Sequence, residues 1–257
     1  SMKIDVNSDM GEGFGVYQVC DDSALMDRVS SANIACGFHA GDPAIMTRMV
    51  RLAKARGVGI GAHPGLPDRQ GFGRKEMAFS ADEICQQVVY QLGALSAIAR
   101  AEGTRVAHLS FHAAMGNMIN RDDALALQVM QTVARIDSQL IIFCQPDTII
   151  ERAAQAAGLP TLTLFLADRA YDDRGQLVPR GIPGSLIKEE TAVRARVRQF
   201  LQQGTVTTFS GNTLPVRARS ILVHSDTPGS LALATLVRSE IEACGATVAP
   251  AAEVLAQ

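Results

Sequence analysis

The stretch from Ala32 to Pro43, ANIACGFHAGDP, runs from an apolar segment into glycine and proline and places His39 just after the change. Three further histidines follow the same rule: His63 in VGIGAHPG, His112 in HLSFH and His224 in ILVHSDTPG. An α/β barrel collects its catalytic groups at the carboxyl ends of successive strands. Four imidazoles placed in this way converge on one pocket, so the pattern predicts an enzyme built on such a barrel.

Apolar runs typical of buried parallel strands recur along the chain between longer amphipathic segments. They cover residues 3–7, 32–36, 57–62, 105–111, 139–143, 161–165, 206–209 and 219–224. Seven or eight strand-then-helix units fit a closed parallel barrel, or a variant with one unit missing. A doubly wound open sheet is the competing architecture. We favour the barrel because an open sheet concentrates its polar clusters at one switch point, whereas here they are spread along the chain.

Several helices have recognisable beginnings in the sequence. Asp42, followed by a proline, is typical of a helix cap. Ser80 and Glu83 form a capping-box pattern. Pro146 and Pro228 are expected to begin two further helices in the same manner. Two stretches fit no repeat, residues 63–79 and 168–187, and their length and content of glycine, proline and charge predict the walls of a pocket.

Length and composition limit the class of protein. The chain has 257 residues, which suits one large α/β domain over residues 2–257, with Ser1 taken as a cloning remnant. A net charge of −2 and 19% charged residues argue against a nucleic-acid partner. No apolar run approaches the roughly 20 residues that span a bilayer, and the amino end lacks a signal-peptide core. We therefore expect a cytoplasmic protein without a membrane partner. The five scattered cysteines predict neither disulfides nor a zinc ribbon.

The first strand leads into DVNSDMGEGFG, which carries Asp9 and Glu12 at a strand end. Acidic groups in such a place act as general bases or metal ligands, although Asp9 could instead only cap the turn. With His39 and His63, Asp9 could form an Asp/His/His metal site, or the three could exchange protons with a substrate. Whether a metal binds stays open. His108 lies inside its strand, where a packed or supporting role is expected.

Four arginines lie in the loops or near strand ends. They are Arg74, Arg169, Arg180 and Arg217. Because the guanidinium group binds carboxylates through two parallel hydrogen bonds, one or two of them could hold an anionic substrate or phosphate. Solvation of the surface is the alternative for each one taken alone.

Five motifs together resemble one known family in order and spacing. They are DVNSDMGEGFG, SSANIACGFHAGDP, GVGIGAHPGLPDRQGFGR, ADRAYDDRGQLVPR and LVHSDTPG. The family is LamB/YcsF, which comprises the A subunits of bacterial ATP-dependent 5-oxoprolinase. The resemblance implies a distorted seven-stranded parallel (β/α) barrel, TIM-like and related to the glycoside hydrolase and polysaccharide deacetylase barrels.

The resemblance also implies a reaction and its partners. 5-Oxo-L-proline, ATP and water give L-glutamate, ADP and phosphate; the assembly consumes the ATP and requires separate B and C subunits. The resemblance places Asp9, His39, His63 and His112 on family motif positions, and from their placement we expect catalytic roles for them. It also places Glu12, Asn33, Arg74, Asn117, Asp168, Arg169, His224 and Asp226 on such positions, and we expect these residues to bind the substrate. We expect Asp9 or His112 to be the base for water, His39 and His63 to polarise the lactam carbonyl, and Arg74 to hold the substrate carboxylate.

The chain departs from the family at the strand end that bears His112. Where the family reads HVKPHGALYN, residues 108–117 read HLSFHAAMGN, so Ser110 replaces a lysine and Ala113 a glycine. Leu164 stands where the family tends to have a glutamate. Two alternative functions therefore stay open: a metal-dependent amidohydrolase or deacetylase that needs no ATP, and a non-catalytic paralogue that binds a lactam.

Overall fold

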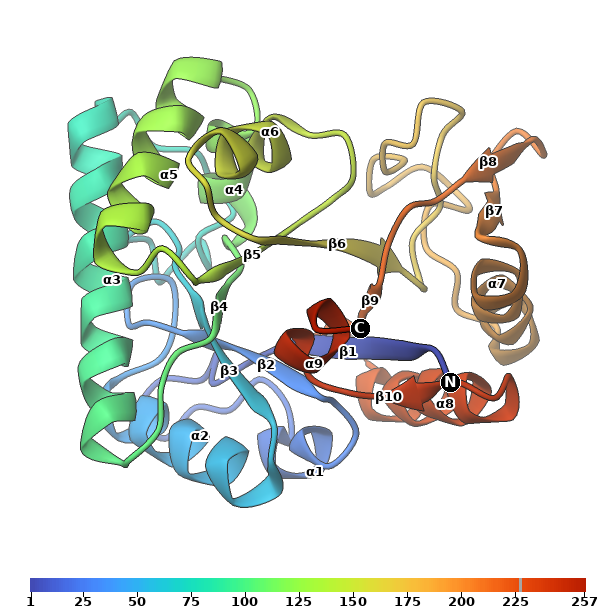
Figure 1. Cartoon of the computed structure of the whole chain (residues 1–257), viewed down its shortest axis with the longest axis horizontal. Helices are drawn as coiled ribbons and strands as arrows, with labels where there is room; N and C mark the ends of the chain where they lie inside the picture. Colours follow the sequence, from blue (N-terminus) through green and yellow to red (C-terminus); the bar gives the residue numbers. More distant parts are fainter. Residues whose placement is uncertain (227) are drawn as a thin grey trace.

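A sheet of parallel strands closes on itself in the computed structural model, which describes residues 1–226 and 228–257 (Figure 1). The eight strands of this sheet run in the order β10-β1-β2-β3-β4-β5-β6-β9, and an additional pairing joins β1 to β9. That pairing closes seven strands into a barrel and leaves β10 (Thr247–Val248) outside, against the start of β1. The barrel strands are β1 (Lys3–Met10), β2 (Ser31–Ala35), β3 (Gly59–His63), β4 (His108–Leu109), β5 (Ile141–Cys144), β6 (Thr161–Leu166) and β9 (Ser220–Leu222). The predicted barrel is confirmed.

Helices follow most of the strands and surround the barrel (Figure 1). They are α1 (Asp22–Met26), α2 (Pro43–Arg56), α3 (Ala81–Ala101), α4 (Ala113–Ile119), α5 (Asp123–Ile136), α6 (Ile149–Ala156), α7 (Glu190–Gln203), α8 (Ser230–Ala243) and α9 (Ala251–Leu255). Apolar side chains between the strands and these helices form one large core.

The helix beginnings show where the sequence patterns were reliable. The Asp42 side chain accepts from the Ile45 N–H at the start of α2, and Ser80 and Glu83 form the expected capping box of α3. The prediction that Pro146 and Pro228 begin helices is wrong. The residue after each proline, Asp147 (φ 61°) and Gly229 (φ 86°), adopts a left-handed backbone conformation. A positive φ does not fit a right-handed helix, so α6 begins three residues after Pro146 and α8 two residues after Pro228.

The segment at residues 206–209 was expected as a possible eighth barrel strand, and this is also wrong. Its strand β7 (Thr205–Thr207) pairs antiparallel with β8 (Thr213–Pro215) outside the barrel. Because β6 pairs directly with β9, the barrel closes without it. Figure 1 shows the β7–β8 hairpin beyond the end of α7, away from the closed sheet.

The last helix, α9, closes the amino-terminal end of the barrel. Val254 packs with the inward-facing Ile141 and Phe143 of β5 and Leu162 of β6. The carbonyl of Val254 accepts from Arg219 Nη2 at 2.7 Å, just before β9. In the described part of the chain, the barrel interior is therefore filled at its amino-terminal end, and the pocket lies at the carboxyl ends of the strands.

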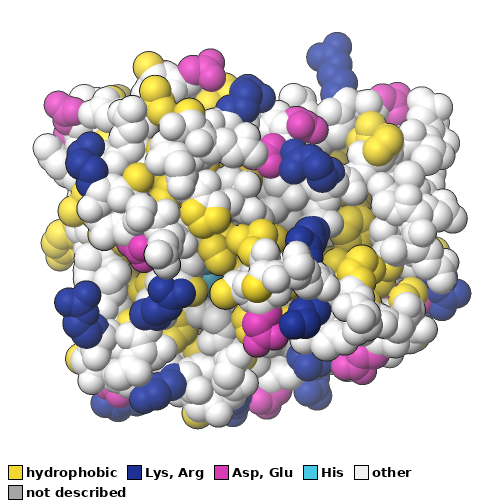
Figure 2. Space-filling view, viewed as in Figure 1, with side chains coloured by type: hydrophobic (Ala, Val, Ile, Leu, Met, Phe, Trp, Pro, Cys, Tyr) yellow, Lys and Arg dark blue, Asp and Glu magenta, His cyan; other side chains and the backbone are white. Residues whose placement is uncertain are grey.

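The surface shows charges of both signs. On the face seen in Figure 2, basic and acidic side chains are interspersed, and neither sign forms one continuous patch. None of the helices in residues 1–226 and 228–257 combines the length and the apolar character needed to cross a membrane.

Candidate active site

A pocket opens at the carboxyl ends of the barrel strands and has a volume of about 430 Å³. Its walls include Phe72 and Arg74 from the loop at residues 63–79, and Arg169 and Arg180 from the loop at 168–187. The sequence prediction that these two loops form pocket walls is confirmed. The volume lies in the range of small-molecule sites.

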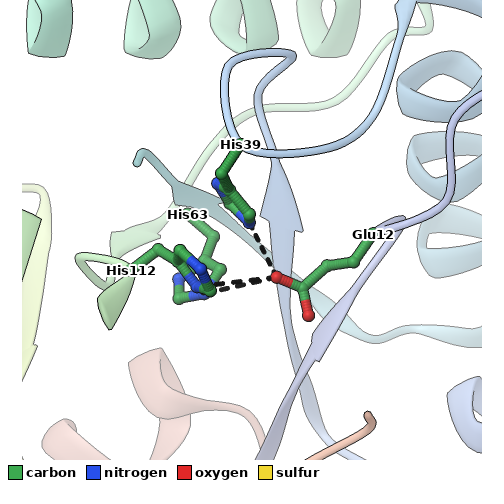
Figure 3. Close-up of side chains that lie close together, drawn as sticks. All are labelled: Glu12, His39, His63 and His112. Carbon is green, nitrogen blue, oxygen red and sulfur yellow. Dashed lines mark hydrogen bonds and ion pairs between the residues drawn. The ribbon is translucent and has the colours of Figure 1, made fainter. Parts of the chain in front are cut away.

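Three of the four strand-end histidines gather around Glu12 (Figure 3). Glu12 follows β1, His39 follows β2, His63 ends β3 and His112 precedes α4. The Glu12 Oε2 atom lies 2.7 Å from His39 Nε2, 3.6 Å from His112 Nδ1 and 3.9 Å from His63 Nε2. All four side chains are buried. The rule that strand ends converge therefore located this cluster correctly.

Burial controls the charge of this cluster. It lowers the pKa of His112 to about 3 and holds the pKa of His39 well below its usual range, with neighbouring histidines adding to both effects. Burial and then the charge of Asp9 raise the pKa of Glu12 well above its usual range. His39 and His112 are thus neutral imidazoles at neutral pH, which leaves each ring one nitrogen lone pair for a proton or an ion.

A chain of hydrogen bonds supports Asp9 from inside the barrel. Asn33 Nδ2 donates to Asp9 Oδ1 at 3.1 Å and to Asn7 Oδ1 at 3.0 Å. Because both amide hydrogens are used, Asn33 Oδ1 accepts from His108 Nε2 at 2.7 Å. His108 is fully buried and stacks on Phe143 at 4.1 Å between ring centroids, so the supporting role predicted for it is confirmed.

A different part of the barrel contributes the other walls. His224 Nδ1 lies 3.5 Å from Asp168 Oδ1, and Arg74 forms an ion pair with Asp226. Burial alone would lower the pKa of His224, but the nearby carboxylate of Asp168 outweighs it and raises that pKa. Burial alone would raise the pKa of Asp226, but its contacts with Arg74 outweigh this effect and lower it. Arg74 therefore already has a carboxylate partner.

Arg169, in the same wall, forms no ion pair with a carboxylate among the described residues. Its side chain is buried, its Nη2 donates to the Val178 carbonyl at 2.9 Å, and its Nε has no partner among the described residues. Burial, and then the charge of Arg180, lower its pKa. A buried guanidinium with a free donor favours an anionic ligand.

The structure separates the predicted site residues into two groups. Nine of them line the pocket: Asp9, Glu12, His63, Arg74, His112, Asn117, Arg169, His224 and Asp226. The other three, Asn33, His39 and Asp168, lie behind it in contact with Asp9, Glu12 and His224 respectively. Arg217 pairs with Glu151 at 2.8 Å rather than facing this pocket.

The pocket also contains polar residues that the sequence patterns do not indicate, among them Asn120 and Gln145. Gln145 directly follows β5, so the strand-end rule applied to every polar residue would have found it. Asn120 follows helix α4 and accepts from the Ile150 N–H at 3.0 Å, a position that no strand pattern marks.

One cluster has the composition of a metal site. Possible ligand atoms of Glu12, His39, His63 and His112 all lie within 4.8 Å of one another. This set differs from the Asp9, His39 and His63 set considered from the sequence. Asp9 Oδ1 is 3.4 Å from His63 Nε2, whereas His39 makes its short contact with Glu12.

Comparisons with known proteins agree with this arrangement. The A subunit of 5-oxoprolinase from Pectobacterium atrosepticum is 77% identical over 255 residues, which cover 99% of each chain. The crystal structure of the lactam utilization protein from Thermus thermophilus superposes with a TM-score of 0.92 at 40% identity, covering 96% of this chain and 99% of that one. A GH113 β-1,4-mannanase shares the fold alone, with a TM-score of 0.53 at 10% identity, covering 93% of this chain and 100% of that one. This likeness agrees with the predicted barrel fold.

Residues 4–256, nearly the whole chain, match the model of one family. This range contains the motifs quoted from the sequence, the barrel and the strand-end cluster. The alignment with the 77% identical relative likewise covers 99% of the chain, so it includes the barrel. The chain belongs to the LamB/YcsF family.

Proposed function

We propose that the chain is the A subunit of an ATP-dependent 5-oxoprolinase, which opens the lactam of 5-oxo-L-proline to L-glutamate. One observation carries this proposal: the Glu12 and histidine cluster and Arg169 line the same pocket. Arg169 is a buried cation without an ion-pair partner among the described residues, and its Nε has no hydrogen-bond partner there. Hydrolysis of a cyclic amide needs a group that activates water, and a substrate carboxylate needs a cation. A small anionic lactam matches both requirements, and the name of the Pectobacterium relative supports this choice.

ATP has a thermodynamic purpose in this reaction, because opening a five-membered lactam to the amino acid is uphill at neutral pH. Phosphorylation of the amide oxygen gives an imidate-like species that water can attack. We assign ATP consumption to the assembly with the B and C subunits. Water attack on the activated ring is the step that we assign to this barrel.

Asp9 and His112 are our candidates for the base that activates this water. The Asp9 side chain is 15% exposed and lines the pocket, whereas Glu12 is only 4% exposed. His112 Nε2 lies 2.7 Å from the Phe72 carbonyl, so that nitrogen carries the hydrogen and Nδ1 keeps a lone pair. His39, behind the pocket, would fix Glu12 through its 2.7 Å contact, and His63 would hold the cluster beside the reacting carbonyl.

For the substrate carboxylate, the geometry favours Arg169 over Arg74. Arg74 is already paired with Asp226, and a new anion would have to compete with that carboxylate. Arg169 has a free Nε donor, and Arg180 adds positive charge to the same wall. Both Arg169 and Arg180 come from the loop at residues 168–187, so that loop would select lactams that carry an anionic group.

The test is release of glutamate and ADP from 5-oxoproline and ATP by this chain purified with the B and C subunits encoded in its own genome. Coupled release that requires all three proteins supports the proposal. Release of glutamate without ATP would instead identify a metal-dependent amidohydrolase. No release, beside an active relative assayed in parallel, would contradict catalysis and favour a lactam-binding paralogue.

A further inference from the structure

The hydrogen positions on two rings of the cluster follow from their backbone contacts. His63 Nδ1 lies 2.6 Å from the Ser110 carbonyl, and His112 Nε2 lies 2.7 Å from the Phe72 carbonyl. A carbonyl oxygen only accepts, so each of these nitrogens must carry the hydrogen. In the neutral rings, His63 Nε2 and His112 Nδ1 are then both lone-pair acceptors.

These two acceptor nitrogens face each other at 3.0 Å. Two lone pairs at hydrogen-bond distance repel unless a positive centre lies between or beside them. Either a proton or a metal ion can supply that centre. The carboxylate oxygens that lie beside both nitrogens favour a metal ion, because they complete a set of ligands around one centre.

Carboxylate oxygens complete the surroundings of the two nitrogens. Glu12 Oε2 lies 3.6 Å from His112 Nδ1 and 3.9 Å from His63 Nε2, and Asp9 Oδ1 lies 3.4 Å from His63 Nε2. In a tetrahedral site with bonds of about 2.0–2.1 Å, neighbouring ligand atoms are about 3.4 Å apart. The separations in this cluster bracket that value.

His39 does not belong to the set of direct ligands. Its ring stacks on that of His112 with centroids 3.6 Å apart and planes within 7°. Lone pairs of ring nitrogens lie in the ring plane, so two stacked rings direct them along parallel lines rather than at one ion. His39 Nε2 instead contacts Glu12 Oε2 at 2.7 Å, from behind the pocket. Such a contact fixes a ligating carboxylate.

We propose that Glu12, His63 and His112 bind one divalent transition-metal ion, with Asp9 beside it as a further oxygen donor and His39 positioning Glu12. Two imidazole nitrogens and a carboxylate are a donor set suited to Zn²⁺ and similar ions. Glu12, His63, His112 and Asp9 all line the pocket, so a remaining coordination position would face the substrate space. Such an ion, when bound, lowers the pKa of a coordinated water. Its bond to His112 Nδ1 would occupy the lone pair of that ring, which leaves Asp9 as the candidate base.

The glycines of the loop at residues 63–79 hold this geometry. A Cβ added at Gly73 would lie 2.7 Å from His39 Cβ and 2.9 Å from His112 Cδ2, and one at Gly65 would lie 2.4 Å from His39 Nδ1. The loop backbone thus packs directly on the rings and fixes them in place. Binding would therefore need little rearrangement.

The experiment measures metal binding without substrate, so its outcome is independent of the proposed oxoprolinase reaction. The chelator-treated protein is titrated with Zn²⁺ and Co²⁺ by calorimetry, and the Co²⁺ complex is examined by visible absorption. We expect one ion per chain, with a Co²⁺ spectrum typical of four or five ligands. His63→Ala and His112→Ala should each weaken binding at least ~100-fold, and His39→Ala by ~10- to 100-fold. His224→Ala, in another wall of the pocket, is the matched control and should bind normally.

Two results with the unaltered protein would overturn the proposal. One is the absence of stoichiometric binding of Zn²⁺, Co²⁺ or Mn²⁺ to the folded protein. The other is ¹⁵N NMR evidence that His63 and His112 share a proton in the presence of these ions. If an alanine variant fails to fold, Glu12→Gln removes a charged ligand with little change of shape. A rise in Tm with Zn²⁺ that Glu12→Gln leaves unchanged would equally contradict the site.

Discussion

His108 Nε2 donates to Asn33 Oδ1 at 2.7 Å, and this bond fixes the orientation of the amide that supports Asp9. With its carbonyl held by His108, Asn33 has to present its NH₂ group to Asp9. A fully buried side chain in the barrel interior thus determines the hydrogen bonding of a carboxylate in the pocket.

The same histidine predicts a dependence of stability on pH. Burial lowers the pKa of His108 to about 3, below its value in the unfolded chain, so its contribution is present above about pH 6.5 and is lost as pH falls toward 3. Between pH 7 and pH 5 the loss should be about 2 kcal/mol. His108→Gln, whose amide can still donate to Asn33, should lose less over this range. Urea unfolding of both proteins at the two pH values checks this; equal losses would contradict it.

Turnover by the complete assembly tests the candidate bases. Asp9→Asn keeps an oxygen that can accept from Asn33 but removes the charge, and His112→Ala removes the lone pair at Nδ1. Each change should lower turnover at least ~100-fold if the residue acts as acid or base. Thermal unfolding serves as the control for intact structure, and a near-normal rate in a folded variant would exclude that residue.

Substrate affinity tests Arg169. Loss of a hydrogen bond to a charged group costs about 1.5–3 kcal/mol, so Arg169→Gln should raise KM for 5-oxoproline ~10- to 100-fold with a smaller effect on kcat. Arg169→Lys should recover part of the loss because it keeps the charge. Arg217→Gln, at an arginine paired with Glu151, is the matched control. An unchanged KM in Arg169→Gln would move the carboxylate site elsewhere.

Ala113 predicts a gain in stability. It adopts φ 39°, in the left-handed region, at a position where the family sequence has glycine. A side chain there costs about 1–2 kcal/mol that glycine avoids. Ala113→Gly should therefore raise the unfolding free energy by about 1 kcal/mol, measured by urea denaturation, after allowing for the greater freedom of glycine in the unfolded chain. A loss of stability would show that the surroundings relieve this strain.

Ser110 and Leu164 test whether a charged pair was lost together. Both side chains are buried and line the pocket, at positions where the family has lysine and glutamate. Ser110→Lys alone places an unpaired charge there and should cost about 3 kcal/mol or more. Adding Leu164→Glu should restore much of this loss. A double-mutant cycle measures the coupling, and equal stability of the single and double variants would refute the idea.

The sequence predicted correctly which strand ends carry the site, but it did not predict whether each residue lines the pocket or lies behind it. His63 and Glu12 were correctly assigned to strand ends, because parallel strands of a closed barrel bring those ends together whatever the loops do. His39 follows the end of β2 by four residues, and the turn of that loop carries it behind the pocket. Such a turn depends on tertiary packing, which no local pattern encodes.

The two prolines illustrate the same limit for the fold. Proline suits the first turn of a helix and the second position of a type II turn equally well. The positive φ of Asp147 and of Gly229 shows that the chain turns after each proline instead of starting a helix there. The glycine after Pro228 is a residue type that indicates a turn in the sequence. Aspartate adopts this conformation only when its surroundings favour it.

Helix α9 closes one end of the barrel that holds the candidate active-site pocket. Val254 packs beneath β5 and β6, so in the described part of the chain the barrel is filled at that end, and a molecule that enters the pocket leaves through the same opening. Substrate, water and product therefore compete for one route, bounded by the loops at residues 63–79 and 168–187. A partner protein bound over that opening would control both the entry of substrate and the release of product.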